Sequence, residues 1–549
     1  MVYHLRRTGI IVVFVVGCWF ALGALYNYLN PNTHPSEEER EDVQWIATST
    51  WWLDRQSCRW LGLCGLAHWH PDPAVRPWNK KRAGELLVDD EDDGEEEVKK
   101  PIWEEIPGAG ERIRPGDWDG NPKVLKDVPQ FVLDHAPLIH LYSGEQFWPS
   151  HIEDHLRHLK PYENFTEIDF ERQVDLDNMD ELNRGRRGKY LYMHSNEDVE
   201  ERPDWLSSAY NKPVPYEDVD EEDQLEEDED IEYSESVPEE PTQDDLETWY
   251  DTEGPQFKTA EPFNPTFVAQ PSRYSKTNPI RKRNQSAGLQ PILTKPGGYC
   301  PAPAVLVVVD KGQGIIDAFW FYFYSYNLGT TVLGIRFGNH VGDWEHSLIR
   351  FHNGVPKAVF FSAHSGGIAY TYNAVEKGKG SGREGRPVLY SALGSHAMYA
   401  QPGTHPYVLP FGMLADVTDK GPLWDPALNY LGFHFNTSIT HEVDAKSFLS
   451  PHSTTPLSAP QKSQLESFQP ANSNPTAPTG WWWFNGHWGD KFYALSDRRQ
   501  WRFAGQYHYV NGPLGPRYKN LGRSKVCQSR GQCLIVDSLA AGKKRSWVG

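Results

Sequence analysis

The sequence is short of positive charge and of hydrophobic residues. Its 549 residues contain 54 Lys and Arg against 75 Asp and Glu, a formal net charge of −21. A chain without excess positive charge has little surface to displace the counterions of a phosphate backbone, so nucleic acid is not an expected partner. Hydrophobic residues make up 38%, below the roughly 45–50% usual in globular domains, a range that also counts glycine. P-loop, Rossmann and kinase motifs are also absent.

One long hydrophobic run is present, at residues 9–29. Its 21 residues carry no charge, and a helix of that length spans about 31 Å, which matches a hydrocarbon core. Arg6 and Arg7 precede it and acidic residues 37–39 follow it, so the body should be lumenal. A cleaved signal peptide is the alternative, but the run exceeds the roughly 7–15 residues of a signal h-region. We expect an uncleaved signal anchor in a single-pass protein of the secretory-pathway membrane.

The six cysteines predict two short-range disulfides. Cys58 and Cys64 flank five residues, as do Cys527 and Cys533. That gap does not match the two-to-four-residue gap of a zinc site, and buried free thiols are the remaining alternative. Glycosylation sequons agree with a lumenal body, and they begin at Asn164, Asn284 and Asn436.

Composition divides the chain into three parts. A cytosolic tail and anchor (1–30) and a stalk with an acidic linker (31–100) precede a discontinuous β domain (101–549). Two disordered insertions are expected in that domain, at about 215–257 and 444–478. The first holds 20 acidic residues and no Lys or Arg between positions 215 and 254, so it cannot bury enough apolar surface to become ordered.

Four runs of β-branched or aromatic residues predict strands, at 305–310, 317–327, 345–354 and 357–367. Their spacing and turn signals favour an antiparallel β-sandwich with peripheral helices. A helix is expected after Pro149, where histidines 151, 155 and 158 recur at helical spacing; a solvated face is the simplest interpretation. The tryptophans at 481–488 should be buried core.

The densest polar cluster is NHVGDWEH, at 339–346. In an extended strand Asp343 and Glu345 share one face while Trp344 points to the other. His340 lies three residues back, across a glycine, and can fold over the carboxylates. One imidazole and two carboxylates suit Mg²⁺, Ca²⁺ or Mn²⁺. Adjacent carboxylates would otherwise repel, so we expect a divalent cation or a basic partner.

Three further histidines lie in glycine-rich turns: His364, His396 and His405. Glycine beside histidine permits close approach of a ligand, so these residues, with Trp344, are candidate ligand-binding residues. The alternative is that they cap strands and satisfy loop carbonyls. A serine nucleophile is not expected, because Ser362 and Ser365 lie too close to His364 in sequence and no G-x-S-x-G elbow is present.

Five motifs occur in one order along the chain: APLIHLYSGEQFWPS (136–150), GNHVGDWEHSLIRF (338–351), FFSAHSGG (360–367), RPVLYSALGSHAMYAQPGTHPY (386–407) and NGHWGD (485–490). The set resembles the vacuolar protein sorting-associated protein 62 family, whose members are largely fungal and plant. The resemblance covers most of the ordered chain. It implies a role in vacuolar protein sorting, with the acidic insertion as an added loop.

A more remote resemblance is to the necrosis- and ethylene-inducing-peptide-like proteins, which carry an H-x-x-D-W-E motif and an S-A-H-S/G-G segment on one β-sandwich. In that family the motif binds a divalent cation, and the proteins dock on sphingolipid sugar head groups. The resemblance implies His340, Asp343 and Glu345 as metal ligands. At the family's further Asp ligand this sequence has Asn327, a weaker, neutral ligand.

Three functions remain open. The favoured one is a membrane-anchored lumenal factor of vacuolar protein sorting, binding a glycan, a lipid head group or cargo through a cation-dependent pocket. The second is a metal-dependent hydrolase in which the cation activates water. The third is a structural or cell-surface glycoprotein in which the DWEH segment is only a salt-bridged turn.

Overall fold

The computed structural model describes residues 37–70, 127–170, 172–183, 190–216, 295–332, 334–380, 382–407, 414–437, 467–503, 505–528 and 533–543. The chain divides into two compact units, Met1–Trp69 with Ala494–Gln506, and His70–Tyr493 with Tyr507–Gly549. The predicted anchor at 9–29, most of the acidic insertion and the sequon at Asn284 lie outside the described residues. Within the described ranges, no helix is long and apolar enough to cross a membrane.

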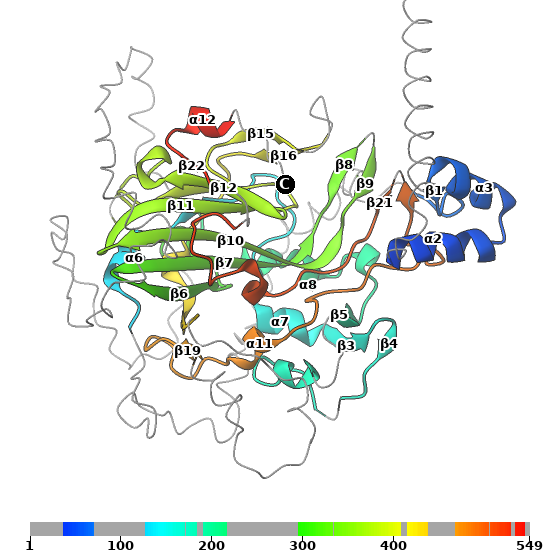
Figure 1. Ribbon diagram of the computed structural model, residues 1–549, viewed down its shortest axis with the longest axis horizontal. Coiled ribbons are helices and arrows are strands. Elements are labelled where there is room, and N and C mark those ends of the chain that lie inside the picture. The colour runs from blue at the N-terminus through cyan, green and yellow to red at the C-terminus, as the bar shows by residue number, and fades with distance from the viewer. Residues whose placement is uncertain are drawn as a thin grey trace, which may run out of the picture. The chain divides into compact units, whose positions relative to one another are not determined.

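An eight-stranded sheet forms the centre of the second unit, in the order β19-β18-β6-β7-β10-β11-β12-β22 (Figure 1). Five neighbouring strands of this sheet occur in the same order along the chain and pair antiparallel. They are β6 (Ala304–Gly312), β7 (Ile315–Asn327), β10 (His340–His352), β11 (Val355–Ala363) and β12 (Gly366–Thr371). The sheet continues on one side through β18 (Tyr430–Phe435) to the edge strand β19 (Phe468–Pro470), and its other edge strand is β22 (Ile535–Val536). All four strands predicted from sequence lie in this sheet.

Smaller sheets surround it. A four-stranded sheet contains β2 (Leu138–His140), β13 (Val388–Ser391), β14 (Met398–Tyr399) and β17 (Leu423–Trp424). A three-stranded sheet contains β3 (Leu159–Glu163), β4 (Thr166–Glu167) and β5 (Leu191–Ser195). Two hairpins pair β8 (Thr330–Val332) with β9 (Ile335–Phe337), and β15 (Gly403–Pro406) with β16 (Ala415–Thr418).

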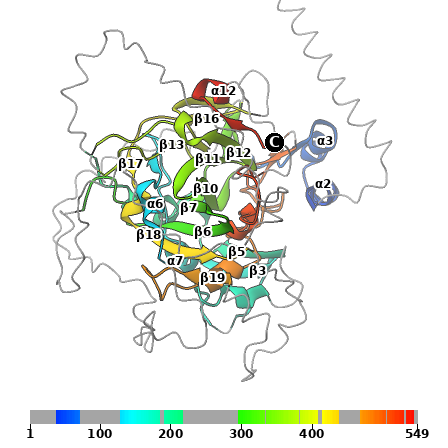
Figure 2. The ribbon, with the colours of Figure 1, turned by 60° about the vertical axis from the view of Figure 1, so that its left-hand side comes forward.

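Among the residues that the structure describes, the helices of the second unit are short. The α-helices are α6 (Gln130–Asp134), α7 (Ile152–Arg157), α8 (Asp204–Ser207), α11 (Gly480–Trp483) and α12 (Leu539–Lys543). The 3-10 turns are η1 (Met179–Asn183), η3 (Val199–Glu201), η4 (Ala209–Asn211), η8 (Tyr372–Ala374), η10 (Pro426–Leu428) and η11 (Pro516–Lys519). Figures 1 and 2 show α7 and β3 below β6, and β16 above β11.

The two faces of the main sheet bury different cores because alternate residues of each strand point to opposite sides. One core joins Phe321, Phe323 and Trp344 to α7, α11 and the three-stranded sheet, and it contains the predicted buried run Trp481, Trp482, Trp483 and Trp488. The other joins Trp320 and Tyr322 to the four-stranded sheet. The structure confirms a mostly β chain. A two-sheet sandwich is not confirmed, since helices and loops take part in covering the first face.

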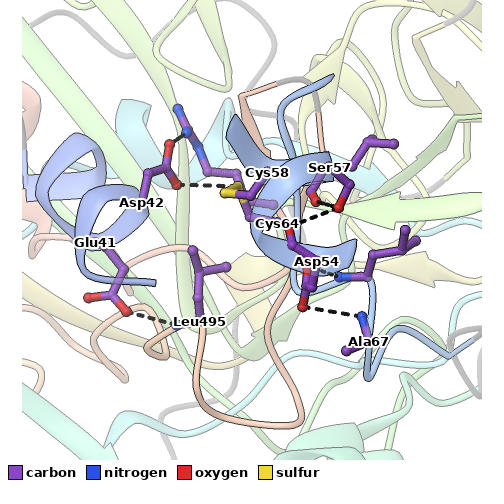
Figure 3. Close-up of a disulfide and its surroundings, with 11 residues drawn as sticks. Glu41, Asp42, Asp54, Ser57, Cys58, Cys64, Ala67 and Leu495 are labelled. Carbon is purple, nitrogen blue, oxygen red and sulfur yellow. Dashed lines mark hydrogen bonds and ion pairs between the residues drawn. A yellow bond between two sulfur atoms is a disulfide. The ribbon is translucent and has the colours of Figure 1, made fainter. Parts of the chain in front are cut away.

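The first unit contains structure where the sequence predicted a stalk. It has α2 (Glu37–Thr48), α3 (Trp52–Leu61), and β1 (Leu63–Cys64) paired with β20 (Arg502–Phe503). The strand β21 (Gln506–Tyr507) follows β20. The predicted disulfide Cys58–Cys64 is present and joins α3 to β1, which gives this short, charged segment a fixed structure (Figure 3).

The structure also bears on three other predictions. The second predicted disulfide, Cys527–Cys533, is also formed, and Cys300 is a buried free thiol. The predicted insertion at 444–478 is too long, because its last part contains β19, which pairs with β18. Of the remaining sequons, Asn164 lies in the turn between β3 and β4 and Asn436 directly follows β18; both are half-buried.

Candidate functional site

Carboxylates and histidines from separate segments meet where β7 and β11 end and β10 begins. We call this group the carboxylate–histidine cluster: Glu145, Asp343, Glu345, Asp416, His340, His364, His396 and His405. The strand β10 supplies three members, and turns or the small hairpin β15–β16 supply most of the rest. The structure therefore brings together all four singled-out histidines with both predicted carboxylates.

Asp343 and His396 form a buried ion pair in the cluster. The His396 ring exposes 0% of its side chain, and its Nδ1 lies 2.9 Å from Asp343 Oδ2. Its Nε2 faces the carbonyl oxygen of Phe147 at 3.1 Å and Glu145 Oε2 at 3.9 Å. Both ring nitrogens thus face oxygen acceptors, which only an imidazolium can satisfy with two N–H donors.

The surroundings of His396 favour this charged form. Burial alone acts to lower the pKa of His396, but the hydrogen bond to Asp343 and the charges of Glu145 and Asp343 outweigh it and raise the pKa. The ring also stacks on Tyr324, with centroids 3.7 Å apart and planes 3° apart, a geometry that stabilises a cation over an aromatic face. Its backbone is left-handed, with φ at 53°, a conformation that non-glycine residues adopt chiefly at special sites.

Glu145 fixes this pair from a loop after β2. One of its oxygens accepts hydrogen bonds from the N–H groups of Gln146 and Phe147. The other accepts one from the N–H of Gly394, at 2.9 Å. The carboxylate thereby ties the loop of β2 to the turn that carries His396, although Gly394 lies 249 residues further along the chain.

Glu345 has no imidazolium directly against it. Its partner is the hydroxyl of Ser362 on β11, which donates to Oε2. Burial raises the pKa of Glu345 to about 7; the positive charge of Lys519 opposes this shift, and Asp343 adds to it. The predicted repulsion between adjacent carboxylates is therefore present, and Lys519 on η11 is a cation that partly offsets it.

A second ion pair lies beside Glu345. His364 sits in the two-residue turn between β11 and β12, with φ at 54°, and its Nε2 lies 2.7 Å from Asp416 Oδ2. Burial acts to lower the pKa of His364, but Asp416 and the more distant Glu345 raise it overall. Burial acts to raise the pKa of Asp416, and the hydrogen bond with His364 lowers it overall.

Tyr399 and His405 extend this second pair. The Tyr399 hydroxyl donates to Asp416 Oδ2 at 2.7 Å. The Tyr399 ring stacks on His405, with centroids 3.8 Å apart, and His405 Nε2 lies 2.9 Å from the hydroxyl of Thr418. His405 is half-buried, so it lies between the buried Asp416 and solvent.

His340 differs from His364 and His396, because its pKa shifts in the opposite direction. Its Nδ1 donates to the carbonyl of Gly342 at 2.6 Å, which leaves the lone pair of the ring on Nε2. Burial lowers the pKa of His340, and Asp343 opposes the shift. Gly342 has φ at 72°, and a Cβ there would lie 2.4 Å from the carbonyl oxygen of Trp488. Only glycine therefore allows the NGHWGD segment to pack against the start of β10.

Two other predicted residues have different surroundings. Trp344 is 1% exposed and packs between Phe323, Trp481 and Trp488 on the opposite face of β10. It belongs to the core and not to the cluster surface. Asn327 pairs with His340 across β7 and β10, and its amide donates to the carbonyl of Gly338 at 2.9 Å.

The histidine stripe of α7 is not the solvated face that the sequence predicted. His155 is 1% exposed, and its Nε2 donates to the carbonyl of Trp488 at 2.9 Å. Burial lowers the pKa of His155 to about 3. His151 caps α7 by accepting from the N–H of Glu153, and His158 stacks on Trp205. The helix is short and packs on the main sheet, so helical spacing places part of the stripe inside.

A divalent cation fits this site only in part. The neutral His340, held through Nδ1–H, has the orientation typical of a metal ligand. Asp343, however, already has His396 as its counter-ion, and Glu345 has Lys519 nearby. Across the described ranges, only one group of three or more His, Cys, Asp or Glu residues places potential metal-ligand atoms within 4.8 Å of one another. This group is Asp42, Cys58 and Cys64. Those two cysteines form a disulfide. Asp343 therefore has a basic partner, which was the alternative to a bound cation. That the predicted ligands bind a cation stays a prediction.

Sequence reasoning missed Glu145, Asp416 and Lys519. Each is a single charged residue in a segment without a local histidine or carboxylate pattern. Glu145 lies within a motif that carried the family resemblance, and that motif was the one signal in the sequence that could have indicated this residue. No such signal was present for Asp416 or Lys519.

Comparisons with known proteins agree with this architecture. The model of the family "Vacuolar protein sorting-associated protein 62" matches residues 319–427, from β7 to η10. The chain is 33% identical over 461 residues to "Vacuolar protein sorting-associated protein 62" of Saccharomyces cerevisiae, covering 79% of this chain and 75% of that protein. It is 30% identical over 428 residues to "Putative vacuolar protein sorting-associated protein TDA6" of the same yeast, covering 73% and 68%. No solved structure matches.

The chain is thus a mostly β protein built around one large sheet with a buried cluster of charged residues at its end. It belongs to the vacuolar protein sorting-associated protein 62 family.

Proposed function

We propose that this chain works in vacuolar protein sorting by binding a sugar-bearing ligand at the carboxylate–histidine cluster. The ligand would be a glycan on cargo or the head group of a glycolipid, which share hydroxyl chemistry. The body would lie in the lumen of a vacuole-directed compartment, anchored by residues 9–29, and a divalent cation at His340, Asp343 and Glu345 would assist binding.

The sorting role is supported by the relatives, both of which are named for vacuolar protein sorting. The lumenal location is supported by two disulfides, Cys58–Cys64 and Cys527–Cys533, because such bonds persist in oxidising compartments. The half-buried sequon asparagines Asn164 and Asn436 agree with that location.

The layering of the cluster carries the binding proposal. Its inner groups, Asp343 and His396, are buried, paired and held by Glu145. Its outer groups, which include His364, are only partly buried, as is the neighbouring Lys519. A rigid charged layer beneath partly exposed donors and acceptors is the arrangement that positions polar groups for a ligand. Sugar hydroxyls both donate and accept hydrogen bonds, so they match mixed imidazole, carboxylate and ammonium groups.

Binding can be tested with His340→Gln and His364→Gln, and with His352→Gln as the control. His352 is also half-buried and lies at the opposite end of β10 from His340. The full chain would be applied to immobilised N-glycans and to vesicles containing glycosphingolipids, each with Ca²⁺ or EDTA. We expect binding that falls at least about tenfold in the two cluster variants and is unchanged in the control. The two ligand formats distinguish cargo glycan from glycolipid, and EDTA tests the cation.

Sorting can be tested in yeast lacking both relatives. Cells carrying this chain should retain a soluble vacuolar hydrolase that cells with an empty vector secrete. A chain that restores nothing would refute the sorting role. Equal glycan binding by the cluster variants and the control would refute the site, and it would favour a structural protein whose histidines hold loops.

A further inference from the structure

The first unit exposes large apolar side chains along one side of α3. Trp52, Leu53 and Trp60 are 64%, 57% and 69% exposed, and Trp51 and Leu61, at the two ends of the helix, are 57% and 52% exposed. Tryptophan and leucine at this exposure are costly in water unless another surface covers them.

These side chains form a face of their own. At about 100° per residue, Trp52, Leu53 and Trp60 fall within an arc of about 100° on α3. The one polar residue within that arc, Gln56, accepts a hydrogen bond from the Trp60 indole at 3.0 Å. Arg59 flanks the arc and is exposed.

The opposite face of α3 holds the unit together. Asp54, Ser57 and Cys58 are buried. The Asp54 carboxylate accepts from the N–H groups of Leu66 and Ala67, and the disulfide to Cys64 fixes the end of the helix (Figure 3). The exposed face is therefore not needed for the fold of this unit and is held rigidly.

The sequence before α2 indicates which surface covers the exposed face of α3. The uncharged run 9–29 ends eight residues before Glu37, where α2 begins. Eight residues span at most about 29 Å, so if the run crosses a bilayer, α2 and α3 stay close to that bilayer. Trp at the lipid–water boundary, with an arginine beside it that can reach lipid phosphates, is the composition of an interfacial helix.

We propose that α3 docks on the lipid bilayer, with Trp52, Leu53 and Trp60 inserted at the level of the head groups. The unit that follows the anchor would then be a second, rigid membrane contact. This surface is separate from the carboxylate–histidine cluster and does not depend on the proposed ligand.

The experiment separates docking from anchoring. A protease recognition sequence is placed within residues 30–36 of the full chain, which is reconstituted in vesicles of phosphatidylcholine and phosphatidylserine and then cut. The cut body should sediment with the vesicles, and brominated acyl chains should quench its tryptophan fluorescence. The variant W52A/L53A/W60A should shift the vesicle partition at least about tenfold toward the supernatant.

The matched control is F165A/Y210A/V355A, whose three residues are 52%, 58% and 54% exposed in the second unit. It should sediment like the unchanged body. Both triple variants alter exposed side chains, so an unchanged melting temperature would show that each is folded. Release of the unchanged body on cutting would overturn the proposal, as would equal sedimentation of the α3 variant. Retention that requires a second protein would also overturn it, in favour of a protein partner.

Discussion

Two equally buried histidines on opposite faces of the main sheet have opposite pKa shifts. His346 and His396 each expose 0%. His346 points into the core of Phe319, Phe321 and Phe360 rings, and neither of its ring nitrogens has a hydrogen-bond partner. Burial lowers its pKa well below the usual value, and nearby Arg523 adds to this.

His396 has the opposite shift because Asp343 lies 2.9 Å from its Nδ1. Burial acts in the same direction on both rings, so it does not by itself decide whether a histidine is charged. The carboxylate decides it. One strand, β10, carries His346 toward the aromatic side and Asp343 toward the other, so alternation along a single strand places the two side chains in different surroundings.

Removing the carboxylate should have the largest effect. Asp343→Asn leaves the His396 imidazolium buried without its counter-ion, and breaking a buried ion pair from one side costs about 3–5 kcal/mol. We expect that decrease in the free energy of unfolding, measured by urea denaturation at pH 6.

The control for this variant is Asp154→Asn. Asp154 pairs with Arg157 at 2.7 Å but is 36% exposed, so its loss should cost well under 1 kcal/mol. If Asp343→Asn costs no more than Asp154→Asn, then His396 is not held as a buried cation, and the contrast between the two faces fails.

On the aromatic face, removing the histidine should stabilise the protein. His346→Leu replaces an imidazole with two unpaired polar atoms by an apolar side chain, and an unsatisfied buried polar group costs about 1–3 kcal/mol. We expect a gain of about 1 kcal/mol by urea denaturation at pH 7, because the branched leucine side chain fits the place of the flat imidazole ring imperfectly, which offsets part of the benefit. His346→Phe, which restores a flat ring, tests that reason. A loss of 2 kcal/mol or more in both variants (roughly a Leu-sized cavity) would mean that His346 makes a polar contact.

The two faces should also respond oppositely to pH. The pKa of His396 is raised, so its stabilisation is complete below about pH 6.5 and is lost as the pH rises through the folded-state pKa. The pKa of His346 is lowered, so its contribution is lost as the pH falls below about 6.5. His396→Gln should therefore remove up to about 1.4 kcal/mol per pH unit of the decline in stability on the alkaline side.

This slope is measured as the free energy of unfolding between pH 6 and 8 in the unchanged chain and in His396→Gln. Glu145, Asp343 and the Tyr324 ring face position 396 in both chains, and the variant removes the imidazole that they surround. His364 titrates in the same direction and remains in both chains. Identical slopes would show that His396 does not change its charge in this range.

The sequence predicted the part of this contrast that depends on local structure alone. Alternation with period two is a local property, so the placement of Asp343 and Glu345 on one face and Trp344 on the other followed from the strand alone. Glycine-rich turns marked His364 and His396. The partners that set their charge could not be predicted, because Glu145 and Asp416 come from distant segments without a pattern of their own. The helices of the first unit were missed because residues 31–100 were predicted, from their composition, to be a stalk with an acidic linker.

The last prediction concerns Glu345, which shares a face with Asp343 but has no imidazolium against it. Burial raises its pKa to about 7, so a charged Glu345 destabilises the fold as the pH rises from about 4.5 through 7. Glu345→Gln can still accept the hydrogen bond from Ser362. We expect it to be more stable by about 1 kcal/mol at pH 8, with a smaller gain at pH 5.

The exposed Glu167→Gln, which changes a half-exposed pair with Lys160, should show no such pH dependence. The opposite result, Glu345→Gln less stable at pH 8 than the unchanged chain, would mean that a positive charge stronger than Lys519 holds the carboxylate ionised. A divalent cation at His340, Asp343 and Glu345 is the group that would do so. Repeating the pH 8 measurement in EDTA would then show whether a metal is that positive charge, because chelation would remove the loss of stability only if a bound metal had caused it.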